Sequence, residues 1–115
     1  MRIFNEPDMG HHVLLNIYDA DKDVLSNMAG FEKFADSLLP SCNAQILTRS
    51  GHQFDGGFTT LYLLTTSHFS IHTWPEHRSA AVDVFTCGAV ETDRIVVETL
   101  AYFRASRHSL SDLLR

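Results

Sequence analysis

Two strand-like segments near the middle of this chain lie so close together in sequence that one direction of pairing is strongly favoured. Residues 67–76, SHFSIHTWPE, alternate apolar or aromatic residues with His and Ser, and residues 79–87, SAAVDVFTC, form a further run of β-forming residues. Parallel strands need a crossover of a dozen or more residues, whereas the TWPEHRS connection is short. The sequence therefore predicts an antiparallel hairpin.

The rest of the chain predicts three more strands and two helices. The strands are runs rich in β-forming residues, and the helices have apolar residues mostly three or four apart. Pro40 is expected to end the first helix, and the residues after Phe103 are expected to form a short tail. Three glycines, Gly51, Gly56 and Gly57, indicate an irregular loop. The strands are expected at 12–19, 44–50 and 59–66, and the helices at 23–39 and 94–103.

These elements predict an α+β fold in a single domain over residues 1–115. A chain of this length fits one domain, and strands outnumber helices. We expect a two-layer sandwich in which a mainly antiparallel sheet carries both helices on one face. The other face then needs a cover of its own, and a homodimer packed sheet on sheet would supply it.

Composition excludes several classes of protein. The net charge of -5 argues against a nucleic-acid binder, which needs a basic face to neutralise phosphates. No apolar run reaches the roughly 20 residues that span a bilayer, and the start MRIFNEPDMG lacks the features of a secretion signal, so we expect a cytoplasmic protein without membrane contact. Two cysteines, Cys42 and Cys87, are too few for a disulfide framework and suit reduced thiols.

Chemically active residue types gather between Ser67 and Cys87, and a zinc site is one interpretation of them. His68, His72, His77 and Cys87 would provide four zinc ligands. In an extended strand, however, His68 and His72 share a face about 13 Å apart at about 3.3 Å per residue, too far to hold one ion. The spacing therefore argues against a metal.

A hydrolase and a purely structural role are two further interpretations. Ser67, His72 and Asp83 could supply a nucleophile, a base and an orienting acid, but no G-x-S-x-G elbow surrounds Ser67. For any single histidine in this segment, a half-buried strand residue satisfied by hydrogen bonds is the simpler explanation.

The segment as a whole, LLTTSHFSIHTWPEHRSAAVDVFTCG, resembles the signature of prokaryotic S-adenosylmethionine decarboxylases. That signature is S-H-x-[ST]-I-H-T-W-P-E followed about ten residues later by D-[VL]-F-T-C-G, and both halves stand here at that separation. Upstream, GHHVLLNIYDADKDVL and HQFDGGFTT are similar to the family's first strand and to the loop before the processing strand. The resemblance covers roughly residues 10–104.

The resemblance implies a cofactor made from the chain itself. Loss of CO₂ from an α-amino acid leaves a carbanion, so such an enzyme needs an electron sink conjugated to the amino nitrogen. The chain has only two lysines and no evident glycine-rich phosphate cradle, which argues against pyridoxal phosphate. In the family, a serine cuts the backbone before itself and becomes a pyruvoyl group. Here this implies cleavage between Thr66 and Ser67 into a β chain, 1–66, and an α chain, 67–115.

The resemblance also assigns roles to further residues. His72 corresponds to a histidine that moves protons during processing, and Thr59 to a hydroxyl that supports ester formation. Cys87 corresponds to a cysteine that assists processing and returns a proton to the substrate carbon. The residues that correspond to the substrate pocket, through ring stacking on adenine and hydrogen bonds to ribose, are Phe54, Trp74 and Glu76.

The chain departs from the family pattern in places that keep other functions open. Thr66 stands where the family usually has Glu, the QFDGGFT loop is about one residue short, and the C-terminal segment is brief. The expected reaction is decarboxylation of S-adenosylmethionine for spermidine synthesis. A pyruvoyl-dependent ornithine or arginine decarboxylase and an unprocessed, non-catalytic relative are the alternatives.

Overall fold

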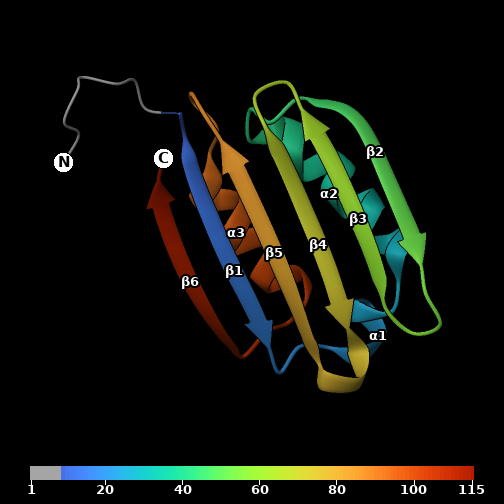
Figure 1. The fold of residues 1–115 in the computed structure, drawn as a ribbon. Coiled ribbons are helices and arrows are strands. Elements are labelled where there is room, and N and C mark those ends of the chain that lie inside the picture. The colour runs from blue at the N-terminus through green and yellow to red at the C-terminus, as the bar shows by residue number, and fades with distance from the viewer. Residues whose placement is uncertain (1–8) are drawn as a thin grey trace.

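The chain folds into one six-stranded antiparallel sheet with its two long helices on one face (Figure 1). A computed structural model describes residues 9–115, and the strand order is β2-β3-β4-β5-β1-β6. Every neighbouring pair is antiparallel, so the predicted two-layer α+β fold is confirmed. The elements are β1 (His11–Tyr18), α1 (Lys22–Leu25), α2 (Met28–Ser41), β2 (Ile46–Gln53), β3 (Phe58–Leu64), β4 (His68–Trp74), a 3₁₀ turn (Pro75–His77), β5 (Ser79–Thr86), α3 (Thr92–Tyr102) and β6 (Arg107–Leu114).

The predicted hairpin is formed by β4 and β5. Its strands pair from His68 opposite Phe85 to Trp74 opposite Ser79, and the 3₁₀ turn joins them. Arg78 closes the turn in the left-handed region, at φ 50°, and its amide donates to the carbonyl of Pro75. The short connection therefore fixes the register of the two central strands.

The single helix expected at 23–39 is wrong, because the chain breaks between α1 and α2. Asn27 caps α2 by accepting a hydrogen bond from the amide of Gly30 at 2.9 Å. Asp21 caps α1 in the same way, and the amide of Val24 that donates to its carboxylate lowers the pKa of Asp21 below its usual value. Apolar spacing continues across the break, so periodicity alone did not reveal it.

Two other boundaries differ from the expectation. Helix α2 continues through Pro40 to Ser41, and the amide of Cys42 donates to carbonyls of that last turn. Strand β2 runs through Gly51, which was expected in a loop. A Cβ at this glycine would lie 2.7 Å from a carboxylate oxygen of Glu32, so the glycine permits α2 to pack closely on the strand.

The expected tail is a strand. β6 pairs with β1 along its whole length, from Arg107 opposite Tyr18 to Leu114 opposite His11. All eight of its residues are exposed, so burial leaves little pattern in its sequence. The sheet therefore has one more strand than the sequence predicted.

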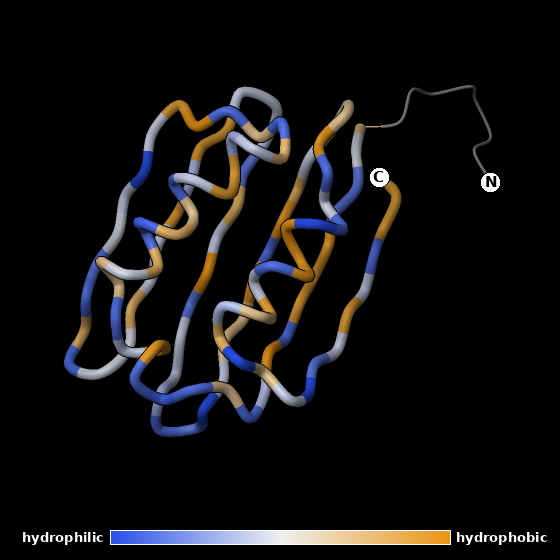
Figure 2. Tube along the Cα trace, turned by 180° about the vertical axis from the view of Figure 1, so that it is seen from behind, coloured by the Kyte–Doolittle hydropathy of each residue, from blue (hydrophilic) through white to orange (hydrophobic). Residues whose placement is uncertain are grey.

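The hydrophobic core lies between the sheet and the helices (Figure 2). Phe31 of α2 is fully buried and packs its ring 5.6 Å from Phe58, 6.1 Å from Phe69 and 5.6 Å from Phe103. Each strand residue in this cluster alternates with a residue on the opposite face of the sheet. The helices therefore cover one face only.

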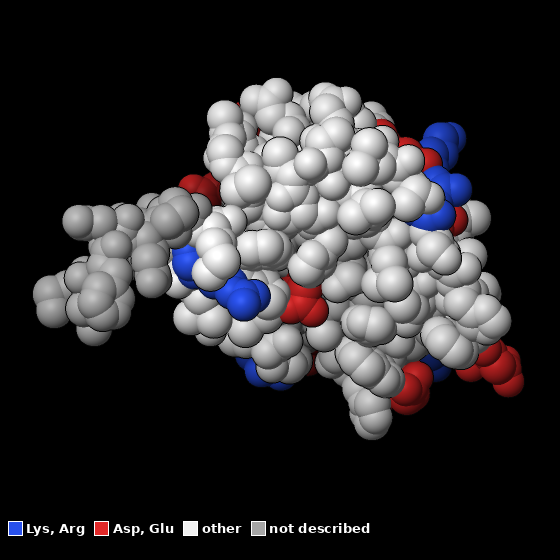
Figure 3. All heavy atoms as spheres, turned by 45° about the horizontal axis from the view of Figure 1, so that its top comes forward, with Lys and Arg blue, Asp and Glu red and all other residues white. Residues whose placement is uncertain are grey.

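The opposite face of the sheet, which we call the open face, is exposed in the single chain yet carries many apolar side chains. Seen obliquely, it carries few charged side chains (Figure 3). Among the described strand residues that point to it, the aspartate, glutamate, lysine and arginine side chains are Asp83 and Arg107 alone, and the other ionisable side chains there include histidines such as His12 and His72. Five large apolar side chains on it are at least 37% exposed: Leu14, Leu61, Leu63, Trp74 and Leu113.

The fold tests few of the predictions about membranes, secretion and cellular location. Within residues 9–115, no helix is both long and apolar enough to cross a membrane. The interpretation of MRIFNEPDMG rests mostly on residues 1–8, which lie outside the described part. The expected cytoplasmic location stays a prediction.

Candidate active site

Three of the predicted site residues meet where β3 turns into β4. The hydroxyl of Ser67 donates a hydrogen bond to the carbonyl oxygen of Thr66, the residue before it. The thiol of Cys87, 20 residues further along the chain, donates to the same oxygen at 3.4 Å. A nucleophilic oxygen and an acidic hydrogen thus lie at one peptide carbonyl, which we call the cleavage end.

The fold positions these groups by hydrogen-bonding both sides of the turn. The amide of Leu64 donates to the carbonyl of Ser67 at 2.9 Å, and the amide of Thr65 donates to the carbonyl of Gln45 at 3.0 Å. Cys87 follows the last residue of β5, and Gly88 then turns the chain away at φ 80°. The β4–β5 pairing therefore sets the thiol beside the turn.

A second group of predicted residues lies toward the other end of β4. Thr59 of β3 is the register partner of His72, and its Oγ1 lies 2.9 Å from the imidazole Nδ1. The ring of Trp74 lies 6.3 Å from that imidazole, on the same face of the sheet. The hydroxyl holds one imidazole nitrogen, which leaves Nε2 available for proton transfer.

These residues line a pocket of about 370 Å³, which we call the pocket end. Phe54 is 54% exposed and Trp74 44% exposed, so both rings are accessible to a ligand. Rings of this kind stack on planar bases, and a carboxylate accepts hydrogen bonds from hydroxyl groups. Its principal lining side chains are Phe54, Asp55, Thr59, His72, Trp74 and Glu76.

The two groups do not meet within one chain. His72 lies five residues after Ser67, a span of roughly 16 Å at about 3.3 Å per residue of strand. The cleavage end thus holds a nucleophile and a thiol without His72, whereas the pocket end holds His72 and the rings without Ser67.

The alternative sites receive no support from this geometry. Asp83 was considered as the acid that orients His72, but its carboxylate lies 3.2 Å from Nε2 of His12. For the four zinc-ligand candidates, no group of three or more His, Cys, Asp or Glu side chains within residues 9–115 could hold a metal ion.

Two features of the site were not predicted from the sequence. Asp55 lines the pocket, and in the sequence it lies between Phe54 and Gly56. Its place in the HQFDGGFTT segment is the signal that could have identified it. The hydrogen-bonding contact between His12 and Asp83 joins β1 to β5 on the open face, with the His12 ring 6.2 Å from that of His68. This pair joins residues 71 positions apart, so no local pattern could have predicted it.

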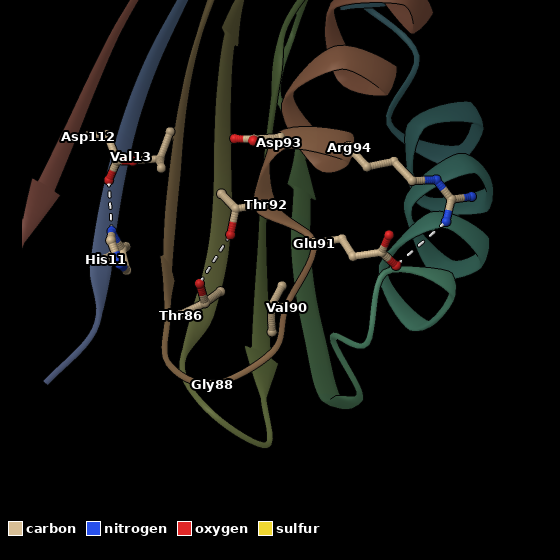
Figure 4. A pocket seen from close by; sticks show the side chains of 10 residues that line it. All are labelled: His11, Val13, Thr86, Gly88, Val90, Glu91, Thr92, Asp93, Arg94 and Asp112. Carbon is tan, nitrogen blue, oxygen red and sulfur yellow. Dashed lines mark hydrogen bonds and ion pairs between the residues drawn. The ribbon is translucent and has the colours of Figure 1, made fainter. Parts of the chain in front are cut away.

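A separate pocket of about 500 Å³ opens at the start of α3, on the helix-covered side (Figure 4). Two pairs of ionisable side chains in its lining contact each other. His11 lies 3.2 Å from Asp112, and Arg94 lies 3.9 Å from Glu91. None of the predicted site residues lines it.

Comparisons of the whole chain with known proteins point to one family of enzymes. A sequence profile of the S-adenosylmethionine decarboxylase family matches residues 11–115. A Methanococcus aeolicus protein named S-adenosylmethionine decarboxylase proenzyme is 35% identical over 109 residues, 93% of each chain. A Synechococcus protein of the same name is 38% identical over 109 residues, 93% of this chain and 85% of its own length.

The fold comparison gives the same result. The crystal structure of the adenosylmethionine decarboxylase from Aquifex aeolicus superimposes with a TM-score of 0.87 at 28% sequence identity. The match covers 96% of this chain and 92% of the other. The likeness therefore extends over the whole sheet and both helices.

Proposed function

This chain belongs to the S-adenosylmethionine decarboxylase family, and we propose on that premise that it cuts itself between Thr66 and Ser67 and decarboxylates S-adenosylmethionine with the resulting pyruvoyl group. The observation that carries the proposal is the convergence of the Ser67 hydroxyl and the Cys87 thiol on the Thr66 carbonyl. A serine, a scissile carbonyl and a proton donor are what self-processing requires.

The processing reaction starts at the cleavage end. The Ser67 oxygen attacks the Thr66 carbonyl carbon, the C–N bond breaks as the nitrogen gains a proton, and an ester replaces the amide. Removal of the Ser67 α-proton then expels the Thr66 carboxylate. Tautomerisation and addition of water release ammonia and leave residue 67 as the pyruvoyl end of the second chain. The bound ketone supplies the electron sink that stabilises the carbanion left by CO₂.

In this proposal Cys87 acts both in self-processing and in decarboxylation. Its thiol hydrogen lies toward the Thr66 oxygen, where negative charge develops during attack by Ser67. After processing, the same thiol borders the new ketone and can return a proton to the substrate carbon.

A second copy of the chain completes the site in this proposal. Within one chain His72 is too far from Ser67 to remove its α-proton directly. If two open faces pack about a twofold axis with their strands antiparallel, the cleavage end of one chain lies over the pocket end of its partner. The exposed leucines of the open face, such as Leu14 and Leu61, give such a dimer an apolar contact.

The pocket end then binds the adenosyl part of the substrate. Phe54 and Trp74 provide rings for stacking on adenine, and Glu76 provides acceptors for the ribose hydroxyls. These rings also displace water from the ketone when the site is filled.

Intact mass spectrometry of the purified protein tests the proposal. We expect two fragments that meet at Thr66 and Ser67, with the second carrying a pyruvoyl group in place of its amino-terminal serine. Incubation with carboxyl-labelled S-adenosylmethionine should release labelled CO₂, and ornithine and arginine serve as comparison substrates. A single mass for the uncleaved chain, without CO₂ release, would contradict the proposal.

A further inference from the structure

The pocket end contains a carboxylate that adenosine recognition does not need. Asp55 and Glu76 both line the pocket, and no lysine or arginine does. Glu76 is occupied by ribose in the proposed function, whereas Asp55 has no role in it. A second carboxylate in a site whose described lining includes His72 but no lysine or arginine favours a ligand that carries a positive charge.

The loop that carries Asp55 is held firmly by one side chain. The amide nitrogen of Gln53 donates to three loop carbonyls, those of Phe54 at 3.2 Å, Gly56 at 3.3 Å and Gly57 at 2.9 Å. The amide of Phe54 also donates to the carbonyl of Gly57 at 2.8 Å. Asp55 is therefore presented on a closed turn.

The same glutamine ties this turn to the helical layer. Its Oε1 accepts a hydrogen bond from the amide of Met28, the first residue of α2, at 3.2 Å. Gly56 adopts φ 117°, a conformation that a side chain would strain. A preorganised loop of this kind orders Asp55 before a ligand arrives, which reduces the entropy lost on binding.

We propose that Asp55 determines specificity by recognising the positive charge on the sulfur of S-adenosylmethionine. This inference rests on the proposed function. The aromatic rings of the pocket bind adenosine by stacking and also attract a sulfonium over their faces. The carboxylate of Asp55 adds a second attraction that depends on the ligand's charge and that the neutral thioether S-adenosylhomocysteine lacks, so Asp55 accounts for a separate part of the difference between the two affinities.

The test compares binding of the two ligands by titration calorimetry in full-length chains that carry Ser67→Ala, which cannot turn over. Adding Asp55→Asn removes the charge and keeps the shape of the side chain. We expect it to weaken S-adenosylmethionine binding about threefold to tenfold, as for a partly screened charge pair, and to change S-adenosylhomocysteine binding less than about twofold. Glu98→Gln, an exposed carboxylate on α3, controls for net charge and should change neither.

A second variant separates charge from loop shape. Gln53→Leu removes the hydrogen bonds that close the turn, so we expect it to weaken the binding of both ligands by a similar factor. If Asp55→Asn weakened the binding of both ligands equally, or of neither, the inference would be overturned. CO₂ release by the unmodified chain reports on the proposed function separately. An active enzyme in which Asp55→Asn leaves the ligand preference unchanged would therefore refute this inference and leave the proposed function standing.

Discussion

The two ends of the open face differ in what each contributes to chemistry. At the cleavage end, the groups are a nucleophile and a proton donor around a peptide carbonyl, that of Thr66. At the pocket end, they are an imidazole, two rings and two carboxylates. In the proposed function each end supplies half of an active site, and the strand that carries both is too long for them to meet. The difference between the two ends is therefore the reason for proposing that two copies of the chain complete each site.

Removal of the nucleophile gives the largest expected effect. Ser67→Ala should abolish both self-cleavage and CO₂ release, because no other hydroxyl contacts the Thr66 carbonyl in the described chain. A denaturing gel and labelled-CO₂ release measure the two losses, and circular dichroism checks that the fold is kept. Ser70→Ala, three residues further along in β4, is the matched control and should still be cleaved. A cleaved, active Ser67→Ala protein would remove this serine from the mechanism.

Mixed dimers test whether the two ends come from different chains. Ser67→Ala and His72→Ala proteins should each be inactive alone, but a co-expressed mixture should regain about a quarter of the parent activity. Half of randomly assembled dimers are mixed, and each has one complete site of two. No recovery in a mixture proven to contain mixed dimers would show that each chain completes its own site.

A charge on the open face should separate the two copies. Leu61 is 48% exposed in the single chain, so Leu61→Asp should leave the fold intact but place two unpaired carboxylates in the dimer contact. We expect the dimer dissociation constant to rise by about a thousandfold, with loss of cleavage. Sedimentation measures the constant. Val97→Asp, on an exposed site of α3, should remain dimeric, and a monomeric parent protein would refute the arrangement.

Loss of the thiol should slow self-cleavage without abolishing it. Cys87→Ala removes one of the two donors to the Thr66 oxygen, and we expect self-cleavage to slow about a hundredfold, as when one oxyanion donor is lost. Time courses of fragment formation measure the rate. Cys42→Ala, in a buried cysteine away from the site, should not slow it. An unchanged rate in Cys87→Ala would limit this thiol to the later decarboxylation or exclude it.

Much of the fold could be predicted because its central elements carry local patterns. The β4–β5 hairpin follows from alternation and a short connection, and both strands lie where the sequence placed them. The break at Asn27 was missed because apolar residues on both sides of it pack inward. Strand β6 was missed because it is exposed throughout and pairs with β1, about 90 residues away, so its pairing leaves no local pattern.

The residues of the candidate site could be named from the sequence one by one, but their division between two ends could not. The resemblance to the family named Ser67, His72 and Cys87 without saying where each lies. The distance between Ser67 and His72 follows from the strand rise, whereas the approach of Cys87 to the Thr66 carbonyl depends on how β3, β4 and β5 are aligned. Asp55 lies in the HQFDGGFTT loop, but the resemblance assigned it no role.

The smallest expected effect concerns how the pocket end holds its imidazole. Thr59→Val keeps the size of the side chain and removes the hydroxyl 2.9 Å from Nδ1 of His72, so the ring loses the contact that fixes its orientation. A lost hydrogen bond of this kind corresponds to about tenfold in the rate of the proton-transfer step. Ester formation at the partner's cleavage end should proceed, so the ester, detected by its cleavage with hydroxylamine, should accumulate. Thr59→Ser restores a hydroxyl and should restore the rate; if it did not, side-chain packing rather than the hydrogen bond would be what His72 requires.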